Sequence, residues 1–399
     1  MAIGILKAGV NSQDVTASTG TDVVDTVNYV YEYADGYSSD TTVTVGSGGD
    51  YATINEALTY LHKKSKEYES GNPLVTINLL TGFEMAEQVI CDGINLGWVR
   101  ITSDDAEVTI IRSALLETNI ENLDYTSKPA FLAVNSGALP KISALFTMDS
   151  SGTSSEKHGV MCAWDGFVHV DLGCGVKNAG SRGLYLVGAR AFARDTIWSG
   201  AGERGIRIGN GSIATIRGST ATGCGEYNLA IDGASIVSAQ ECDFSSGLGS
   251  ANINISGASN VKLDDSLSTD ATGYGLEIKD SSTVSAKNIA LDRAGNRGAI
   301  ITASTLECAS ATAADCVNAA ISLAQGASVN AQSMICTGSL GTNAVICSTG
   351  SRMNFKNGTA SSVASAIAIS EGSHINATGA TGSTNTAVNT LTNKGVIYQ

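Results

Sequence analysis

Apolar and polar residues alternate in short runs that recur at a fixed interval from Gly159 to the end of the chain. In Gly275-Leu276-Glu277-Ile278 the two apolar side chains project to one face, as expected of a strand buried on one side. The same pattern recurs at Gly183-Leu184-Tyr185-Leu186, Gly205-Ile206-Arg207-Ile208 and Asn252-Ile253-Asn254-Ile255, with Asn228 between the last two, and continues at Gly298, Ala320, Ala344, Ala366 and Ala387. From residue 159 to residue 387 there are ten intervals over 228 residues, about 23 residues each, a period typical of a solenoid.

The repeat predicts two files of inward-facing apolar side chains, because alternate residues of a strand share a face. The first file holds Leu184, Ile206, Leu229, Ile253, Leu276, Ile321 and Ile367, and the second holds Leu186, Ile208, Ile231, Ile255, Ile278, Ile301, Leu323 and Ile369. The turns between the strand-like pieces are too short for the crossover helices that an α/β sheet needs. The sequence therefore predicts an all-β fold, a three-sided parallel β-helix with rungs of about 23 residues.

One amphipathic helix is expected before the strands begin. Thr53 and Glu56 have the spacing of a capping box, and Ile54, Ala57, Leu58 and Leu61 fall on one helical face. Such a helix would cover the open end of the apolar interior, as a solenoid requires. Short β-branched runs follow at residues 75–79, 87–91, 99–102 and 108–111.

These features divide the chain into three parts. Residues 1–44 lie outside the repeat, residues 45–74 hold an entry strand and the capping helix, and residues 75–399 form the β-helix, with regular rungs over 159–399. In the first part, alternation over residues 27–33 places Tyr29, Tyr31 and Tyr33 on one face of a possible strand. A small β-rich attachment module, an interface-forming arm and a loose tethered tail are all compatible with this composition.

Composition narrows the function. The formal net charge is −14 and the pI about 4.7, which argues against a nucleic-acid partner. No run approaches 18 apolar residues, so no membrane insertion is expected, and the first residues lack the features of a signal peptide. Nine cysteines without a Cys-x-x-Cys pair and only 4 histidines predict no metal site, and no cofactor motif is present.

Two glutamates are the first candidates for catalysis. Glu203 and Glu226 occupy the same slot of consecutive rungs, and neighbouring strands lie about 4.8 Å apart. Retaining glycosidases hold their two carboxyl groups about 5–5.5 Å apart, so a general acid and base could stand here. The alternative is that both are ordinary solvated carboxylates at turns. Asp195 is a third catalytic candidate, although its neighbours Arg194 and Arg217 also suit a ladder of surface ion pairs.

Aromatic and charged residues on the same rungs are candidates for ligand binding. Sugar rings present apolar C–H faces as well as hydroxyl groups, so aromatic side chains beside polar ones suit a carbohydrate. Burial of the aromatic residues against a neighbouring subunit is the alternative. The candidates are Trp164, Tyr185, Trp198, Arg204, Arg207, Tyr227 and Asp232.

The last quarter of the chain has a different surface. From residue 299 to residue 399 the sequence contains six charged residues, Glu307, Asp315, Arg352, Lys356, Glu371 and Lys394. Ser, Thr, Ala, Asn and some apolar residues fill the remaining outward positions. Such a surface suits close packing against copies of the same chain, and a homotrimer is expected.

Two segments resemble phage proteins. Residues 45–57, Val-Gly-Ser-Gly-Gly-Asp-Tyr-Ala-Thr-Ile-Asn-Glu-Ala, are similar to the cap of pectate-lyase-type β-helices in bacteriophage tailspikes and tail fibres. Residues 392–399, Thr-Asn-Lys-Gly-Val-Ile-Tyr-Gln, resemble the closing segment of some short β-helical phage fibres. The resemblance implies a right-handed β-helix and a homotrimer that binds a bacterial surface polysaccharide and, in many members, cleaves it.

The combined prediction is a phage tailspike or tail fibre that acts in host adsorption. It would be made in the host cytoplasm, reside in the virion and contact tail or baseplate proteins through its N-terminal segment. Glycan cleavage by a hydrolase or lyase remains open, and a non-enzymatic receptor-binding or structural fibre is the alternative. A secreted plant-polysaccharide lyase fits less well, because neither a signal peptide nor a recognisable Ca²⁺/Arg site is present.

Overall fold

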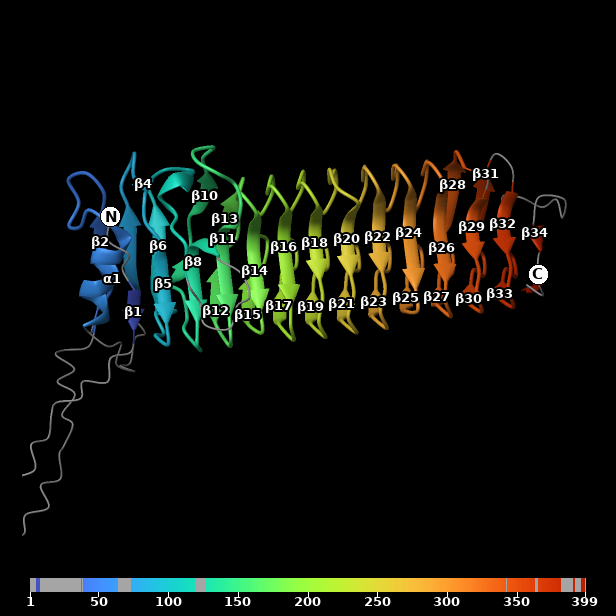
Figure 1. Cartoon of the computed structure of the whole chain (residues 1–399), viewed down its shortest axis with the longest axis horizontal. Helices are drawn as coiled ribbons and strands as arrows, with labels where there is room; N and C mark the ends of the chain where they lie inside the picture. Colours follow the sequence, from blue (N-terminus) through green and yellow to red (C-terminus); the bar gives the residue numbers. More distant parts are fainter. Residues whose placement is uncertain are drawn as a thin grey trace, which may run out of the picture.

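The computed structural model of the chain is a long column of parallel strands (Figure 1). It describes residues 5–7, 37, 39–63, 73–118, 127–341, 343–362, 365–381, 390–391 and 396–398. The column is a right-handed parallel β-solenoid, so the predicted fold class is confirmed.

Two long sheets run the length of the column, with every strand paired in parallel to the equivalent strand of the next rung. The 14-stranded sheet consists of β1 (Ile5–Lys7), β5 (Val89–Asp92), β8 (Lys128–Val134), β11 (Lys157–Ala163), β14 (Arg182–Val187), β16 (Arg204–Gly209), β18 (Tyr227–Ile231), β20 (Ala251–Ile255), β22 (Tyr274–Ile278), β24 (Arg297–Thr302), β26 (Ala319–Ala324), β29 (Asn343–Cys347), β32 (Ser365–Ile369) and β34 (Thr390–Leu391). The 15-stranded sheet consists of β2 (Thr41–Val45), β3 (Val75–Leu79), β6 (Val99–Ser103), β9 (Lys141–Ile142), β12 (Phe167–Val170), β15 (Arg190–Ala193), β17 (Ile213–Thr215), β19 (Ile236–Ser238), β21 (Asn260–Lys262), β23 (Thr283–Ser285), β25 (Thr305–Glu307), β27 (Ser328–Asn330), β30 (Arg352–Asn354), β33 (His374–Asn376) and β35 (Val396–Tyr398).

The third side of the column is less regular than the other two. Its sheets contain β4 (Glu84–Met85), β7 (Val108–Ile110), β10 (Leu145–Met148) and β13 (Gly175–Lys177) at one end and β28 (Ile335–Ser339) and β31 (Thr359–Ser362) at the other. Between them single bridges join Ile197, Thr220, Asp243, Leu267, Ala290 and Thr312. In the rungs between these two sheets, the third strand that a three-sided column implies is therefore reduced to one bridging residue.

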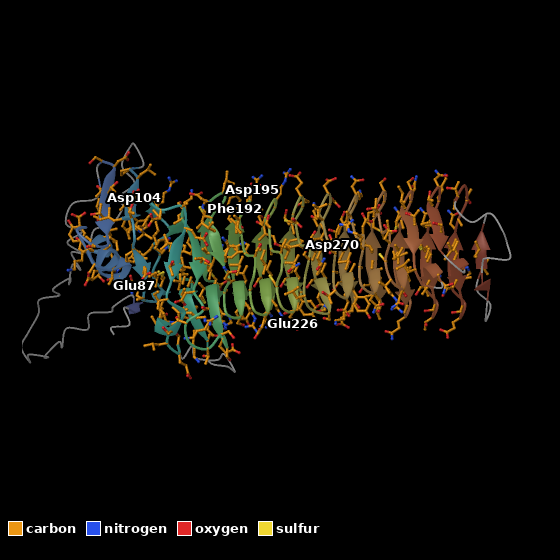
Figure 2. All side chains as sticks on the ribbon, turned by 90° about the horizontal axis from the view of Figure 1, so that it is seen from above. Glu87, Asp104, Phe192, Asp195, Glu226 and Asp270 are labelled. Atoms are coloured by element: carbon orange, nitrogen blue, oxygen red, sulfur yellow. The ribbon has the colours of Figure 1, made fainter. Side chains whose placement is uncertain are left out.

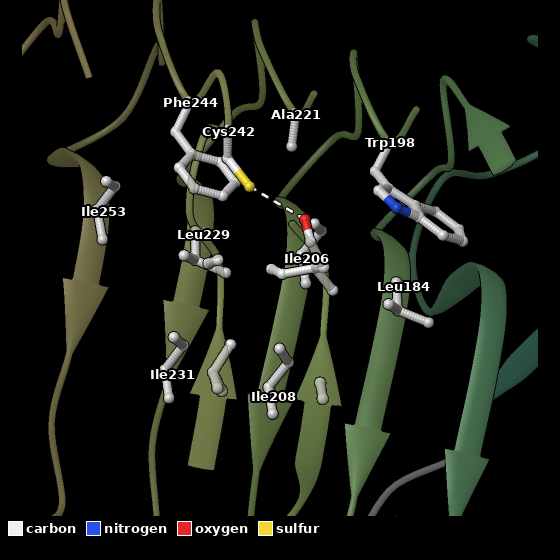
Figure 3. Packing of buried hydrophobic residues seen from close by; sticks show 14 of the residues in the cluster. Leu184, Trp198, Ile206, Ile208, Ala221, Leu229, Ile231, Cys242, Phe244 and Ile253 are labelled. Carbon is white, nitrogen blue, oxygen red and sulfur yellow. Dashed lines mark hydrogen bonds between the residues drawn. The ribbon is translucent and has the colours of Figure 1, made fainter. Parts of the chain in front are cut away.

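The interior contains the predicted apolar files. Leu184, Ile206, Leu229 and Ile253 are paired rung to rung and completely buried, and Figure 3 shows them stacked along the column. Burying one such side chain contributes about 1.5–3 kcal/mol, so the repeated file is a large stabilising term.

Buried serines close the corner that follows the 14-stranded sheet. Ser235 Oγ donates a hydrogen bond to the carbonyl of Asp232 at 2.7 Å, and the N–H of Ser235 donates to Ser259 Oγ of the next rung at 3.3 Å. Ser259 and Ser282 continue the ladder in the same way. The hydroxyl groups thus satisfy backbone groups that the tight corner would otherwise leave unpaired inside the protein.

The nine cysteines carry free thiols. Cys174 is half-buried and the other eight are buried, including Cys162 and Cys347 in inward positions. Burial raises the pKa of the Cys91 thiol to about 12, so this group stays protonated at neutral pH. The thiols act here as small apolar side chains.

Helix α1 (Ile54–His62) lies at the N-terminal end of the column (Figure 1). The predicted capping box is present, since Thr53 Oγ1 accepts from the N–H of Glu56 and the Glu56 carboxylate accepts from the N–H of Thr53. The buried Glu87 carboxylate, which the sequence reasoning missed, also accepts from the N–H groups of Ile54 and Asn55, at 2.6 and 3.0 Å. The apolar face of α1 is buried as predicted and covers the end of the core.

The N-terminal segment contributes strands to the column. β1 pairs with β5 and β2 pairs with β3, so the expected boundary at residue 44 falls inside β2. Tyr29, Tyr31 and Tyr33 lie outside the described residues. Tyr37 is buried, donates to the carbonyl of Leu61 at 3.5 Å, and its pKa is raised by burial to about 12.

Candidate functional site

Glu203 and Glu226 stand on consecutive rungs, immediately before β16 and β18. The N–H of Glu226 donates to the carbonyl of Glu203 at 2.6 Å, and both side chains are about 40% exposed. Each carboxylate is bound by the arginine of the preceding rung. Arg204 donates two hydrogen bonds to Glu226, from Nε to Oε2 at 2.8 Å and from Nη2 to Oε1 at 3.1 Å. Arg182 Nη2 lies 3.3 Å from Glu203 Oε2. A catalytic acid and base at this position would have to work from within ion pairs.

Other predicted ligand-binding residues extend this ion-pair band across the outer face of the 14-stranded sheet. Arg207 Nε lies 3.3 Å from Asp232 Oδ2, and its guanidinium stacks 5.2 Å above the Tyr185 ring. Arg204 lies 5.5 Å from the Tyr227 ring. The structure therefore brings these five residues together, but Tyr185 is buried.

The two tryptophans do not belong to the exposed band. Trp198 has no exposed surface, lies in the apolar interior, and donates from Nε1 to Thr196 Oγ1 at 2.7 Å (Figure 3). A wholly internal side chain cannot contact a glycan on the surface, so the expectation for Trp198 is corrected. Trp164 is half-buried and packs against an outward-facing apolar cluster, Ile90, Leu132, Val134, Met161, Ala163, Tyr185 and Val187.

Asp195 lies on a different side of the column from Glu226. It follows β15 of the 15-stranded sheet, whereas Glu203 and Glu226 precede strands of the 14-stranded sheet. Figure 2 shows Asp195 and Glu226 on opposite edges of the molecule. The three candidate catalytic carboxylates do not converge on one site.

Asp195 instead borders a hollow on the outer surface of the 15-stranded sheet. The hollow has a volume of about 280 Å³ and is lined by His169, Val170, Asp171, Leu172, Phe192, Arg194 and Asp195. Phe192 is 40% exposed and meets the His169 ring edge to face, with centroids 5.0 Å apart. An exposed aromatic ring therefore stands beside a polar ring and two carboxylates.

The electrostatics of the hollow centre on Asp171. Burial would raise the pKa of this carboxyl, but hydrogen bonds from Lys141 and Ser143 and the charges of Lys141 and Arg100 lower it overall. Lys141 Nζ lies 2.7 Å from Asp171 Oδ1. Burial and then the charge of Lys141 lower the pKa of His169, while Asp171 at 3.9 Å opposes this effect. At neutral pH a neutral imidazole thus faces an ionised carboxylate.

The sequence reasoning missed His169, Asp171 and Phe192. Alternation in Phe167-Val168-His169-Val170 and Arg190-Ala191-Phe192-Ala193 places His169 and Phe192 outward. The register then pairs His169 directly with Phe192. Alternation was therefore an available signal for outward aromatic residues, but it could not supply the pairing.

Two further properties concern metals and membranes. Within the described residues, no group of three or more His, Cys, Asp or Glu side chains is arranged to hold a metal ion. None of the helices in this described part of the chain has the length and apolarity that a bilayer crossing requires.

Comparisons with known proteins give one family model and several solved structures. The A-module of a mannuronan C-5 epimerase from Azotobacter vinelandii is 11% identical, with 82% of this chain and 91% of that chain covered and a TM-score of 0.43. The catalytic domain of an α-1,3-glucanase in complex with nigerose is 10% identical over 90% of this chain and 68% of its own, with a TM-score of 0.46. An Acinetobacter phage tailspike is 10% identical over 82% and 57%, with a TM-score of 0.39. No match was found among curated protein sequences. Residues 172–312 match the family described as the right handed beta helix region.

Proposed function

We propose that the protein is a phage tailspike or tail fibre that recognises a bacterial surface polysaccharide during host adsorption. The observation that carries glycan recognition is the exposed Phe192 ring, which stands against His169 and beside Asp171 and Asp195 in one hollow. An aromatic face next to fixed polar groups offers both kinds of contact that a sugar ring needs. The assignment as a tailspike or tail fibre is supported in addition by the resemblance of residues 45–57 and 392–399 to phage β-helices.

The hollow can be tested by binding. Surface polysaccharides extracted from a panel of bacterial strains are titrated against the purified full chain, the Phe192→Ala variant and the Leu248→Ala variant. Leu248 is an exposed apolar side chain at the corner that precedes the 14-stranded sheet, so it controls for loss of surface hydrophobicity. We expect Phe192→Ala to weaken binding at least ~10-fold, which corresponds to about 1.4 kcal/mol, and Leu248→Ala to leave it unchanged.

Two results would contradict the proposal. If Phe192→Ala and Leu248→Ala changed the affinity equally, the hollow would not be part of the binding surface. Failure of the wild-type chain to bind any polysaccharide in the panel would remove glycan recognition itself.

Cleavage of the glycan is the second candidate function. Glu203 and Glu226 occupy consecutive, partly exposed slots, which favours a paired acid and base, but both are engaged by arginines. Released oligosaccharides from host capsule or lipopolysaccharide would identify a hydrolase or lyase. If Glu203→Gln and Glu226→Gln variants cleave at the wild-type rate, these residues are not the catalytic pair. Binding without release supports the non-enzymatic fibre.

The homotrimer is proposed from the last quarter of the column. Val317, Ile335 and Leu340 are exposed there among few charges, so contact with further copies would bury apolar surface. Sedimentation equilibrium of the full chain should give three times the monomer mass of 40.8 kDa. A monomer at micromolar concentration would exclude this assembly. Attachment of residues 1–44 to tail or baseplate proteins completes the proposed role.

A further inference from the structure

The outer face of the 15-stranded sheet carries an unusual balance of charge. The chain has 38 acidic and 24 basic residues, yet the described outward positions of these strands contain a single carboxylate, Glu307. The lysines and arginines at such positions are Arg100, Lys141, Arg190, Lys262 and Arg352. Asp171, at the end of β12, pairs with Arg100 and Lys141, so the attraction of this face for anions depends on Arg190, Lys262 and Arg352, for which the described residues show no ion pair.

Arg190 on this face differs from the arginines of the 14-stranded sheet. Arg204 and Arg207 on the 14-stranded sheet are paired with Glu226 and Asp232, whereas Arg190 has no ion pair within the described residues. Arg190 is also exposed. A guanidinium presents five donors in a planar fork that matches a carboxylate, so its free donors favour a carboxylate-bearing ligand.

The position of Arg190 joins this charge to the hollow. Arg190 and Phe192 project from the same face of β15, two residues and therefore roughly 7 Å apart along the strand. The register places Arg190 beside Phe167 on one neighbouring strand and beside Ile213 on the other. One sugar ring could lie on Phe192 while a carboxylate on that ring or the next one reaches Arg190.

We infer that β15 forms a subsite for a carboxylate-bearing sugar, so that the polysaccharide bound by this protein is acidic. Phe192 supplies the apolar contact, and Arg190 supplies the fork that binds the carboxylate. This inference rests on the proposed glycan recognition and specifies the chemical class of the glycan.

The test compares an acidic polymer with its neutral form. Polygalacturonate and its fully methyl-esterified form differ in the charge of the carboxyl group and share the same sugar backbone. The full chain is titrated with each polymer, as are Arg190→Gln and Arg217→Gln. Arg217 is a matched control because it is also exposed and its loss changes the net charge equally, but it is already paired with Glu241. Thermal melts verify that both variants are folded.

We expect the wild-type chain to prefer the acid form at least ~10-fold, since a hydrogen bond to a charged group contributes about 1.5–3 kcal/mol. Arg190→Gln should remove this preference, and Arg217→Gln should retain it. Equal binding of acid and ester, or equal effects of the two substitutions, would overturn the acidic-sugar subsite while leaving glycan recognition intact. Binding of neither polymer also counts against the subsite. The proposed glycan recognition itself would be contradicted only if the wild-type chain also failed to bind every extracted bacterial polysaccharide.

Discussion

Single residues on the outer surface differ in how firmly the fold holds them. Asp171 accepts hydrogen bonds from Lys141 and Ser143, and these contacts lower its pKa despite partial burial. Glu241 is paired with Arg217 at an exposed corner, where solvent weakens the attraction. The two carboxylates therefore contribute unequally to stability.

Replacing Asp171 with Asn should destabilise the protein at neutral pH but not in acid. Because the folded-state pKa is lowered, ionised Asp171 stabilises the fold above its ordinary value of 3.8, and this contribution is lost as the pH falls through the folded value. We expect a loss of about 1–2 kcal/mol at pH 7 that disappears toward pH 2, measured by urea unfolding across pH. Glu241→Gln serves as the control with little change. A pH-independent loss for Asp171→Asn would contradict the assigned contacts.

Among the elements, α1 is held by a local cap and by a contact that is distant in sequence. The capping box is local and could be predicted from Thr53 and Glu56, but the Glu87 carboxylate reaches the same helix start from 33 residues further along the chain. Burial raises the pKa of Glu87, and the N–H donors of Asn55 and Ile54 oppose that rise. The Glu87 carboxylate thus loses part of its hydration on burial and gains hydrogen bonds from the N–H groups at the start of α1.

Glu87→Ala should therefore weaken the cap of the column. Loss of a capping acceptor costs about 0.5–2 kcal/mol, and here it also leaves the buried N–H of Ile54 and the part-buried N–H of Asn55 without this acceptor. We expect a lower melting temperature in calorimetry, an intermediate value for Glu87→Gln, and no change for the exposed Glu84→Ala. A melting temperature of Glu87→Ala equal to that of the wild type would show that α1 does not depend on this contact.

At the scale of the whole molecule, the sequence shows whether a side chain points into or out of the column, but not which of the three faces of the column it lies on. Inward positions could be predicted because each rung needs an Ile or Leu at the same place, which produces a visible period. Asp195 and Glu203 are eight residues apart in sequence, but the chain turns a corner between them and brings them to different sides. The repeat period does not show how far the chain turns at that corner. The sequence therefore could not show that Asp195 lies on a different side of the column from Glu203 and Glu226. His169 and Phe192 likewise required the register of β12 and β15.

The buried thiols turn the column into its own reporter of unfolding. Each rung contacts mainly its neighbours, so opening can begin at one end and advance along the array. Cys91, Cys162, Cys242, Cys308 and Cys347 mark successive depths between the two ends. In native buffer only Cys174, the half-buried thiol, should react quickly with a maleimide.

Rising urea should then expose the buried thiols in an order that mass spectrometry of the labelled peptides can read. Earlier labelling of Cys347 than of Cys242 would indicate fraying from the C-terminal rungs, whereas simultaneous labelling of all eight buried thiols would mean that the column opens as one cooperative unit. The positions of the buried cysteines along the column thus make it possible to measure how many rungs of a solenoid unfold together.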